Sequence, residues 1–284
     1  MGRDTVGLLI TVTNTADRPL PCLGFELMAR LGRRLRRDVN VVNMQNQGCS
    51  ALLKALDIAR SHVEAHRRQR VLLVVAEGHT GMMRPKEARP YFSFQELARA
   101  GSRDTRGTED LITAFLFGDG AVALLLGSPG PGAKAVFGPL THLSNLEAGD
   151  LELLAMNEGG SLQPEYEGFP SYRLGVRVPE RGAAYARRCW DALMGLEGAR
   201  RPDFVCIHTG SRKILDGVCD ELGFDRAGEG PSGSYGVLRE FGNLSAGSIG
   251  FMLAEHLRRG SRGTGAMVAF GAGFSASAGL VTFP

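Results

Sequence analysis

Three polar residues in this 284-residue sequence have the side-chain types that acyl transfer needs: Cys49, His208 and Asn243. Cys49 follows a glycine and immediately precedes a predicted helix, whose free N–H groups and dipole favour a thiolate. His208 ends a predicted strand, and Asn243 lies in a glycine turn before another predicted helix. A nucleophile, a histidine to pair with it and an amide donor form an acyl-transfer constellation. Taken alone, the segment around Cys49 fits a buried structural cysteine equally well.

Composition excludes several other kinds of site. The five cysteines (Cys22, Cys49, Cys189, Cys206 and Cys219) are widely spaced and include no CxxC pair, so we expect neither a zinc site nor a disulfide framework. No other metal constellation and no dinucleotide fingerprint is present. No apolar run reaches the length of a membrane span. We therefore expect a cytoplasmic enzyme that uses no metal and no cofactor.

The basic residues are nearly all arginine, and they form two clusters. Two interpretations stay open: a solvated helix face, or a landing site for a phosphate-bearing carrier such as coenzyme A or acyl carrier protein. Nucleic acid is not an expected partner, because no aromatic residues are interleaved with the arginines. The clusters are Arg30, Arg33, Arg34, Arg36 and Arg37, and then Arg67, Arg68 and Arg70.

Strands and helices are predicted to alternate, which is typical of a layered α/β fold with a mostly parallel sheet. In the first half we expect strands at 7–13, 38–43 and 70–76 and helices at 23–31 and 51–63. In the second half we expect strands at 204–207, 264–270 and 278–283 and helices at 212–222 and 245–257.

The regions between these elements are predicted to be irregular. We expect a surface excursion at 85–110 and a loop around His142. The linker-like GSPGPG stretch at 127–132 marks the predicted boundary between two units, 1–130 and 131–284. Their similar layout predicts an internal duplication, although no sequence repeat is visible.

At five segments the sequence resembles a known family. MQNQGCSALLKAL, FLFGDGAVALLLG, IHTGSRKILDGV, LREFGNLSAGS and AFGAGFSA occur in the order found in type III polyketide synthases of the chalcone synthase kind, within the thiolase superfamily. β-Ketoacyl-acyl-carrier-protein synthase III, a sister family, resembles the GNLSAG and FGAGFS segments about as well or better. Its histidine is followed by different residues from Thr209-Gly210-Ser211 here.

The resemblance implies a five-layer α-β-α-β-α fold of two related halves and a decarboxylative Claisen condensation. Cys49 would carry the acyl group. His208 would keep Cys49 as a thiolate, and His208 and Asn243 together would hold the enolate oxygen formed from a malonyl thioester. The implied substrates are an acyl-CoA and malonyl-CoA or malonyl acyl carrier protein. A non-condensing acyltransferase and a non-catalytic partner subunit remain alternatives.

The same resemblance implies further site residues. Phe117 and Tyr172 fall at the positions of two phenylalanines that gate the active-site tunnel. The turn carrying Gly271, Gly273 and Phe274 would form a wall of the acyl site. Leu20 falls where type III enzymes pass a residue across the two-fold axis of a homodimer. The start of this sequence resembles an interior stretch of the family, so the opening strands and helices of the first half are expected to be absent.

Overall fold

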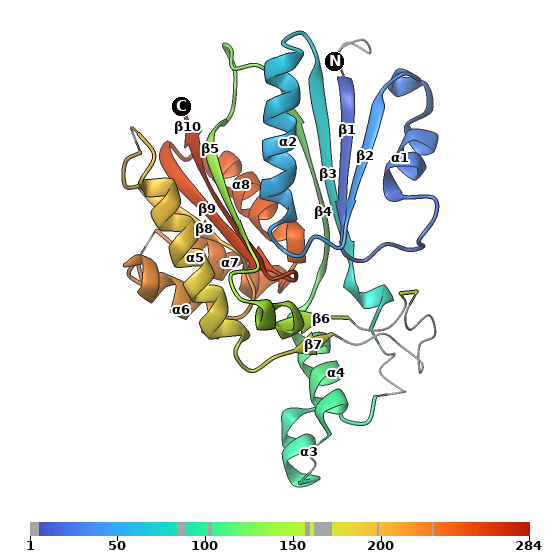
Figure 1. Ribbon diagram of the computed structural model, residues 1–284, viewed down its shortest axis with the longest axis vertical. Coiled ribbons are helices and arrows are strands. Elements are labelled where there is room, and N and C mark those ends of the chain that lie inside the picture. Colours follow the sequence, from blue (N-terminus) through green and yellow to red (C-terminus); the bar gives the residue numbers. More distant parts are fainter. Residues whose placement is uncertain are drawn as a thin grey trace.

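The protein, described from a computed structural model, has five layers of helix and sheet (Figure 1). The structure describes residues 6–83, 89–101, 104–156, 160–161, 172–197, 199–228 and 230–284. In space the layers follow the order α1, first sheet, α2 with α8, second sheet, α5 with α6. The predicted α-β-α-β-α arrangement is confirmed.

The first sheet has the strand order β2 (Asn40–Gln45), β1 (Val6–Thr13), β3 (Arg70–Gly78) and β4 (Asp119–Leu126). β1 is parallel to both neighbours, with Ile10 opposite Val42 and Leu73, and β4 is antiparallel to β3. The run VGLLITVT suits a central strand because such strands are buried on both faces. On the outer face α1 (Leu23–Leu31) packs against β1. Gly32 caps the carboxyl end of α1 and begins the short helix η1 (Gly32–Arg34).

The middle layer is formed by α2 (Ala51–Ala65) and α8 (Ser248–Arg259), preceded by η5 (Ser245–Gly247). Small and branched apolar side chains form a wide buried face on α2, which is the face that packs between the two sheets: Ala51, Leu52, Leu53, Ala55, Leu56, Ala59 and Val63. Its side chains belong to one core cluster with residues of both sheets and of α8. The first turn of α2 is thereby fixed against both halves of the protein.

The second sheet has the order β5 (Val136–Ser144), β10 (Ser275–Phe283), β9 (Gly263–Gly271) and β8 (Phe204–Ile207). Its outer face is covered by α5 (Val178–Met194) and α6 (Arg212–Leu222), which share a second core cluster with it. α7 (Ser232–Phe241) lies beside α8 and β8. A small ribbon of β6 (Leu154–Ala155) and β7 (Arg173–Leu174) follows η4 (Ala148–Leu153).

The two halves share one structural unit. In the first half α2 leads into β3, which is parallel to β1 and antiparallel to the next strand, β4. In the second half α8 leads into β9, which is parallel to β8 and antiparallel to the next strand, β10. β10 has β5 as a further partner, whereas β4 is an edge strand of the sheet. Leu125 on β4 is 41% exposed. The predicted boundary near residue 130 falls in the β4–β5 connection and stays a prediction.

Several sequence-based expectations were wrong. The region 85–110 is not wholly irregular, because α3 (Phe94–Arg99) and the start of α4 (Thr105–Leu116) lie in it, each capped by a side chain at its first turn. The short helix η2 (His79–Gly81) precedes this region. His142 lies on strand β5 opposite Ser277, not in a loop. α5 and α7 were not predicted, although α5 buries Tyr185, Cys189 and Leu193 at helical spacing.

The central layer allows a stability test. Leu53 of α2 is fully buried between the sheets, whereas Ile58 on the same helix is 41% exposed. We expect Leu53→Ala to lower the free energy of unfolding by about 2–5 kcal/mol, because it leaves a cavity in the shared core. Ile58→Ala, the matched control, should cost about 1 kcal/mol or less. Urea unfolding followed by circular dichroism measures both, and equal losses would contradict the central position of α2.

Candidate active site

The loop that carries Cys49 is shaped by glycines. Gly48 has a φ of 69°, a conformation that L side chains rarely adopt, and a Cβ there would lie 2.7 Å from the backbone nitrogen of Ala272. A Cβ on Gly271 would lie 2.4 Å from the backbone nitrogen of Cys49. The end of β9 therefore packs directly on the loop before Cys49. Gly48 permits the tight turn from strand β2 into helix α2, as expected from the sequence. Gly271, a predicted wall residue, lies against the Cys49 backbone.

A buried carboxylate, Glu77 at the end of β3, organises the surrounding loops. Its oxygens accept hydrogen bonds from the Asn14 backbone N–H (2.9 Å), Asn14 Nδ2 (2.9 Å), Thr15 Oγ1 (3.0 Å) and the Ala246 backbone N–H (3.3 Å). Asn14 in turn accepts from the Gly48 N–H at 2.9 Å and donates to Ser245 Oγ at 3.1 Å. Glu77 thus links the loop before Cys49 to the loop after Asn243.

Asn243 is held beside Phe117 by two backbone hydrogen bonds. Its N–H donates to Leu116 O at 2.8 Å, and its carbonyl accepts from the Gly118 N–H at 3.1 Å. The side-chain Oδ1 accepts from the Ser245 N–H at 2.8 Å, which leaves the NH2 end of the amide as the available donor. Asn243 follows helix α7, after Gly242 with its φ of 74°, in the glycine turn that the sequence predicts.

Cys49 and Asn243 meet at one residue. Cys49 Sγ lies 3.5 Å from Ser245 Oγ, while the Ser245 backbone N–H binds the Asn243 side chain. Two residues that are almost two hundred positions apart in sequence therefore flank the same serine. Ser245 itself has a φ of 49°, which places its backbone in the left-handed region. Its role as the link between them was not predicted.

His208 follows β8 and is 2% exposed. Its backbone N–H donates to Val268 O at 2.9 Å, which continues the parallel pairing of β8 with β9. Side chains alternate along a strand, so His208 faces the same side of the sheet as Cys206, whose side chain belongs to the central core with α2 and α8. The next residue, Thr209, donates from Oγ1 to Gly242 O at 3.1 Å, so the loops of His208 and Asn243 are in contact.

Burial sets the charge of both reactive groups. It raises the pKa of the Cys49 thiol to about 12, and the charge of Glu77 acts in the same direction, whereas the hydrogen bond to Ser245 opposes them. Burial also lowers the pKa of His208 to about 3, and its buried Nδ1 has no hydrogen-bond partner among the described residues. Burial therefore favours a neutral thiol and a neutral imidazole in the resting site. It opposes the thiolate that the helix N-terminus favours, and the charge state of Cys49 stays a prediction.

Three aromatic rings stack beside this site. Phe117 and Tyr172, the predicted gate residues, have ring centroids 5.3 Å apart, and His79 stacks on Phe117 at 4.6 Å. Burial raises the pKa of Tyr172, and the charge of Glu77 acts in the same direction. His79 was missed by sequence reasoning. The signal was its position at the carboxyl end of β3, the same sheet edge as Glu77.

Other predicted residues lie elsewhere. The Phe274 ring is fully buried in the outer core, where it packs against Tyr185 and Phe270, so the structure does not bring this side chain to Cys49. Gly273 belongs to the turn between β9 and β10, with a φ of 125°. Leu20 is 84% exposed in the segment before α1.

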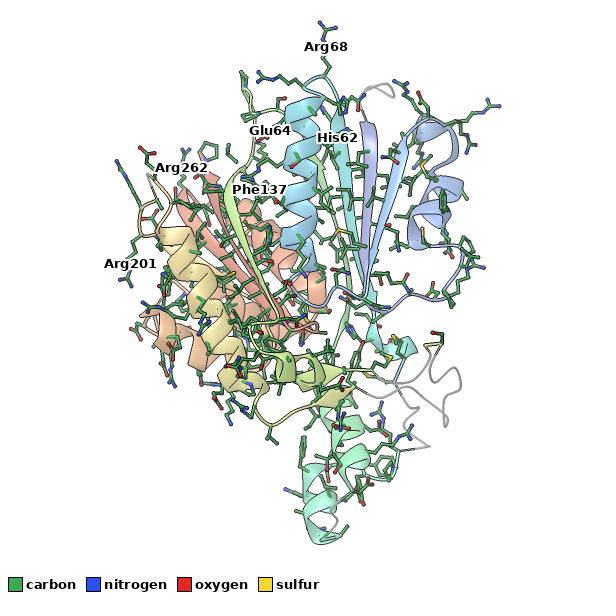
Figure 2. All side chains as sticks on the ribbon, in the orientation of Figure 1. His62, Glu64, Arg68, Phe137, Arg201 and Arg262 are labelled. Atoms are coloured by element: carbon green, nitrogen blue, oxygen red, sulfur yellow. The ribbon has the colours of Figure 1, made fainter. Side chains whose placement is uncertain are left out.

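The arginine clusters lie at the opposite end of the sheet from Cys49. Arg67, Arg68 and Arg70 follow the carboxyl end of α2, whose 15 residues span about 22 Å. Figure 2 shows Arg68 projecting from that end, beyond His62 and Glu64. This position supports a solvated surface for the cluster, since a carrier bound there would approach Cys49 from the wrong end of the helix.

The described part of the chain lacks two kinds of feature, a cluster of metal ligands and a membrane-spanning helix. No three or more His, Cys, Asp or Glu side chains there gather closely enough to hold a metal ion. No helix within the described ranges combines the length and the apolar character needed to cross a bilayer. All five cysteines are free thiols.

Two family models match this chain in different places. Residues 4–131 match the N-terminal domain of chalcone and stilbene synthases, and residues 199–283 match the C-terminal part of 3-oxoacyl-acyl-carrier-protein synthase III. The first part of the chain thus matches one of the two families that the sequence resembles, and the last part matches the other.

Known proteins of both families are similar along most of the chain. Beta-ketoacyl-acyl-carrier-protein synthase III 3 of Streptomyces coelicolor is 26% identical, over 99% of this chain and 77% of its own length. Type III polyketide synthase A of Arabidopsis thaliana is 28% identical, over 88% of this chain and 57% of its own length. The crystal structure of 1,3,6,8-tetrahydroxynaphthalene synthase from Streptomyces coelicolor superimposes with a TM-score of 0.79 at 20% identity, covering 98% of this chain and 72% of that one. The chain thus spans roughly three fifths to three quarters of these relatives.

The raised pKa of Cys49 predicts a particular pH profile for alkylation. A thiol is unreactive while protonated, so the thiolate fraction should rise about tenfold per pH unit until the pH approaches the pKa of about 12. The rate at which iodoacetamide modifies the Cys49 peptide, followed by mass spectrometry, should still be rising at pH 10, whereas an ordinary thiol levels off above about 9. Half-exposed Cys22 provides the internal comparison. A plateau for Cys49 near neutral pH would show a resting thiolate and contradict this description.

Proposed function

We propose that this chain, which belongs with the thiolase-like condensing enzymes that include type III polyketide synthases and β-ketoacyl-acyl-carrier-protein synthase III, carries an acyl group on Cys49 and condenses it with a malonyl thioester. The observation that carries the proposal is the shared contact of Cys49 and Asn243 with Ser245. The loops that carry His208 and Asn243 are joined by the hydrogen bond from Thr209 to Gly242. Condensation needs a nucleophile that carries the acyl group and a hydrogen-bond donor for the oxyanion that forms. Cys49 and the Asn243 amide supply these two groups on either side of Ser245.

The first step is loading of Cys49. Both Cys49 and His208 are neutral at rest, so a ring nitrogen of His208 takes the thiol proton as the sulfur attacks the thioester carbonyl of the acyl donor. The carbon–sulfur bond to the carrier then breaks, and the proton passes from the imidazolium to the departing carrier thiolate. A buried imidazole with an unpartnered nitrogen is suited to hold that proton only transiently.

The second step joins two carbons. A malonyl thioester loses carbon dioxide, and the negative charge that develops on its thioester oxygen is held by the Asn243 NH2 group and by a ring N–H of His208. The enolate carbon attacks the acyl carbonyl on Cys49, the new carbon–carbon bond forms and the carbon–sulfur bond to Cys49 breaks. The products are a β-ketoacyl thioester, carbon dioxide and free Cys49. Apart from the carriers of the two acyl groups, this chemistry requires no cofactor.

The carrier of the malonyl group separates the two family assignments. A type III polyketide synthase-like enzyme would accept malonyl-CoA, which we favour because the residues around Cys49 lie in the part that matches chalcone and stilbene synthases. The match of residues 199–283 favours the second candidate, a synthase III-like enzyme that takes malonyl acyl carrier protein. Carbon dioxide release from each labelled malonyl donor distinguishes them. We place the enzyme in the cytoplasm, a proposal supported by its five free thiols.

Asn243 provides the sharpest test of the mechanism. Asn243→Ala should still form the acyl-enzyme at Cys49, because loading does not use the enolate donor. Carbon dioxide release from the malonyl donor should fall by about two to three orders of magnitude. Asn40→Ala is the matched control and should leave both steps unchanged, because Asn40 is exposed at the start of β2, the end of that strand remote from Cys49. Undiminished condensation by Asn243→Ala would exclude the proposed oxyanion role.

We also propose that the enzyme is a homodimer whose interface includes the segment around Leu20. Leu20 and Phe25 are large apolar residues on the same segment that are 84% and 58% exposed, and exposed apolar groups of this kind mark interaction surfaces. The family resemblance implies a two-fold axis there, with Leu20 reaching toward the partner.

Charge at Leu20 should therefore break the dimer. We expect Leu20→Asp to shift the protein to monomer in sedimentation velocity, because a carboxylate would be buried without a partner. Val176→Asp places the same charge at an apolar residue that is 94% exposed in the second half, and it should leave the oligomeric state unchanged. A wild-type protein that sediments as a monomer at working concentration would refute the proposal.

A further inference from the structure

His79 is a buried histidine that the proposed reaction does not use. It directly follows β3, is 1% exposed and stacks on Phe117, with ring centroids 4.6 Å apart and an angle of 22° between the planes. Its Nδ1 lies 2.9 Å from the carbonyl oxygen of Gly118. The imidazole is therefore fixed in position and in plane by one hydrogen bond and one stacked ring.

The hydrogen bond also determines the tautomer. A carbonyl oxygen can only accept, so Nδ1 carries the proton and Nε2 carries a lone pair. No hydrogen bond of Nε2 to the described residues is present. Burial lowers the pKa of His79, although the charges of Glu77 and Asp119 and the Gly118 carbonyl oppose this effect. The ring is thus neutral at physiological pH, and Nε2 is an acceptor without a donor.

His79 is linked to Cys49 through Phe117. Phe117 is paired through its backbone with Asn243, whose side chain accepts from the Ser245 N–H, and Ser245 Oγ lies 3.5 Å from Cys49 Sγ. Phe117 also stacks on Tyr172, and the His79 and Tyr172 rings are 6.4 Å apart. The acceptor therefore belongs to an aromatic group that Asn243 and Ser245 connect to the cysteine.

We propose that His79 is a specificity-determining residue: its Nε2 accepts a hydrogen bond from the enol hydroxyl of the β-ketoacyl chain produced by the first condensation. The inference rests on the proposed function. A saturated acyl starter has no donor to offer at this position, whereas a β-ketoacyl thioester presents one when it enolises. An acceptor-only group in a buried site thus favours the once-extended chain over other acyl groups. His79 would thereby retain that chain for a second extension.

The test compares product ratios. The full chain is incubated with malonyl-CoA and acetyl-, hexanoyl- or dodecanoyl-CoA, and twice-extended and once-extended products are measured by mass spectrometry. His79→Asn keeps a donor for the Gly118 carbonyl but removes the acceptor, and His79→Phe keeps the stacked ring alone. Both should lower the ratio of twice- to once-extended product about tenfold, as expected for one net hydrogen bond. His79→Gln, which can place an amide oxygen near the Nε2 position, should restore most of it.

The pH dependence provides a second readout. Glu77 and Asp119 are the charged groups that act on His79, and Tyr172 is the ionisable side chain whose ring lies 6.4 Å from it. Because its pKa is lowered, the wild-type product ratio should stay constant through about pH 6.5, where an ordinary histidine titrates. It should fall only in more acidic solution, when the protonated ring can no longer accept.

The outcomes are separable. If wild type loads Cys49 but releases no carbon dioxide from any malonyl donor, the proposed function fails and the inference with it. If wild type condenses and both His79→Asn and His79→Phe keep the wild-type ratio, the inference alone is overturned. Loading of Cys49, measured on the same variants by intact mass, confirms that they are folded. A reduced ratio in His79→Asn and His79→Phe, with recovery in His79→Gln, supports the proposal.

Discussion

The site depends on one buried carboxylate. Glu77 is 4% exposed, and its two oxygens accept hydrogen bonds from two backbone N–H groups, an amide and a hydroxyl. Burying a carboxylate is costly unless such donors surround it, and hydrogen bonds to a charged group contribute about 1.5–3 kcal/mol each. Through Asn14 it fixes Gly48 in the first half, and through Ala246 it fixes the loop after Asn243 in the second. The geometry of the nucleophile and of the amide donor therefore follows from the same group.

That carboxylate also has an electrostatic consequence. Its negative charge adds to burial, the larger effect, in disfavouring a thiolate at Cys49, so Glu77 both organises the loops of the site and opposes ionisation of the thiol. Burial disfavours the charged form of His208 as well, so a Cys49–His208 ion pair is disfavoured before a substrate binds. Under the proposed function, charge develops only when a thioester carbonyl can receive it. Such a site would be protected from adventitious alkylation and oxidation at neutral pH.

Sequence patterns predicted much of the framework and part of the site. The strand at 7–13, the helix ending at Gly32 and the helix 212–222 ending at Gly223 agree closely with the structure, because apolar periodicity and glycine caps are local signals. The stacking of Phe117 on Tyr172 brings together two residues named from resemblance alone. The strand carrying His142 was not recognised, because its burial is set by β10, more than 130 residues away. The Asn14–Glu77–Ser245 contacts and the position of His79 likewise depend on long-range packing that no local pattern records.

The central claim is that Cys49 accepts an acyl group from a thioester donor. Its most direct test is the intact mass of the protein after incubation with a panel of acyl-CoA donors, followed by peptide mapping, in parallel with Cys49→Ala. If Cys49 is the acceptor, the mass rises by one acyl group on the peptide containing Cys49, and the variant stays unmodified. No acylation by any donor of the panel, or the same mass increase in Cys49→Ala, would contradict it.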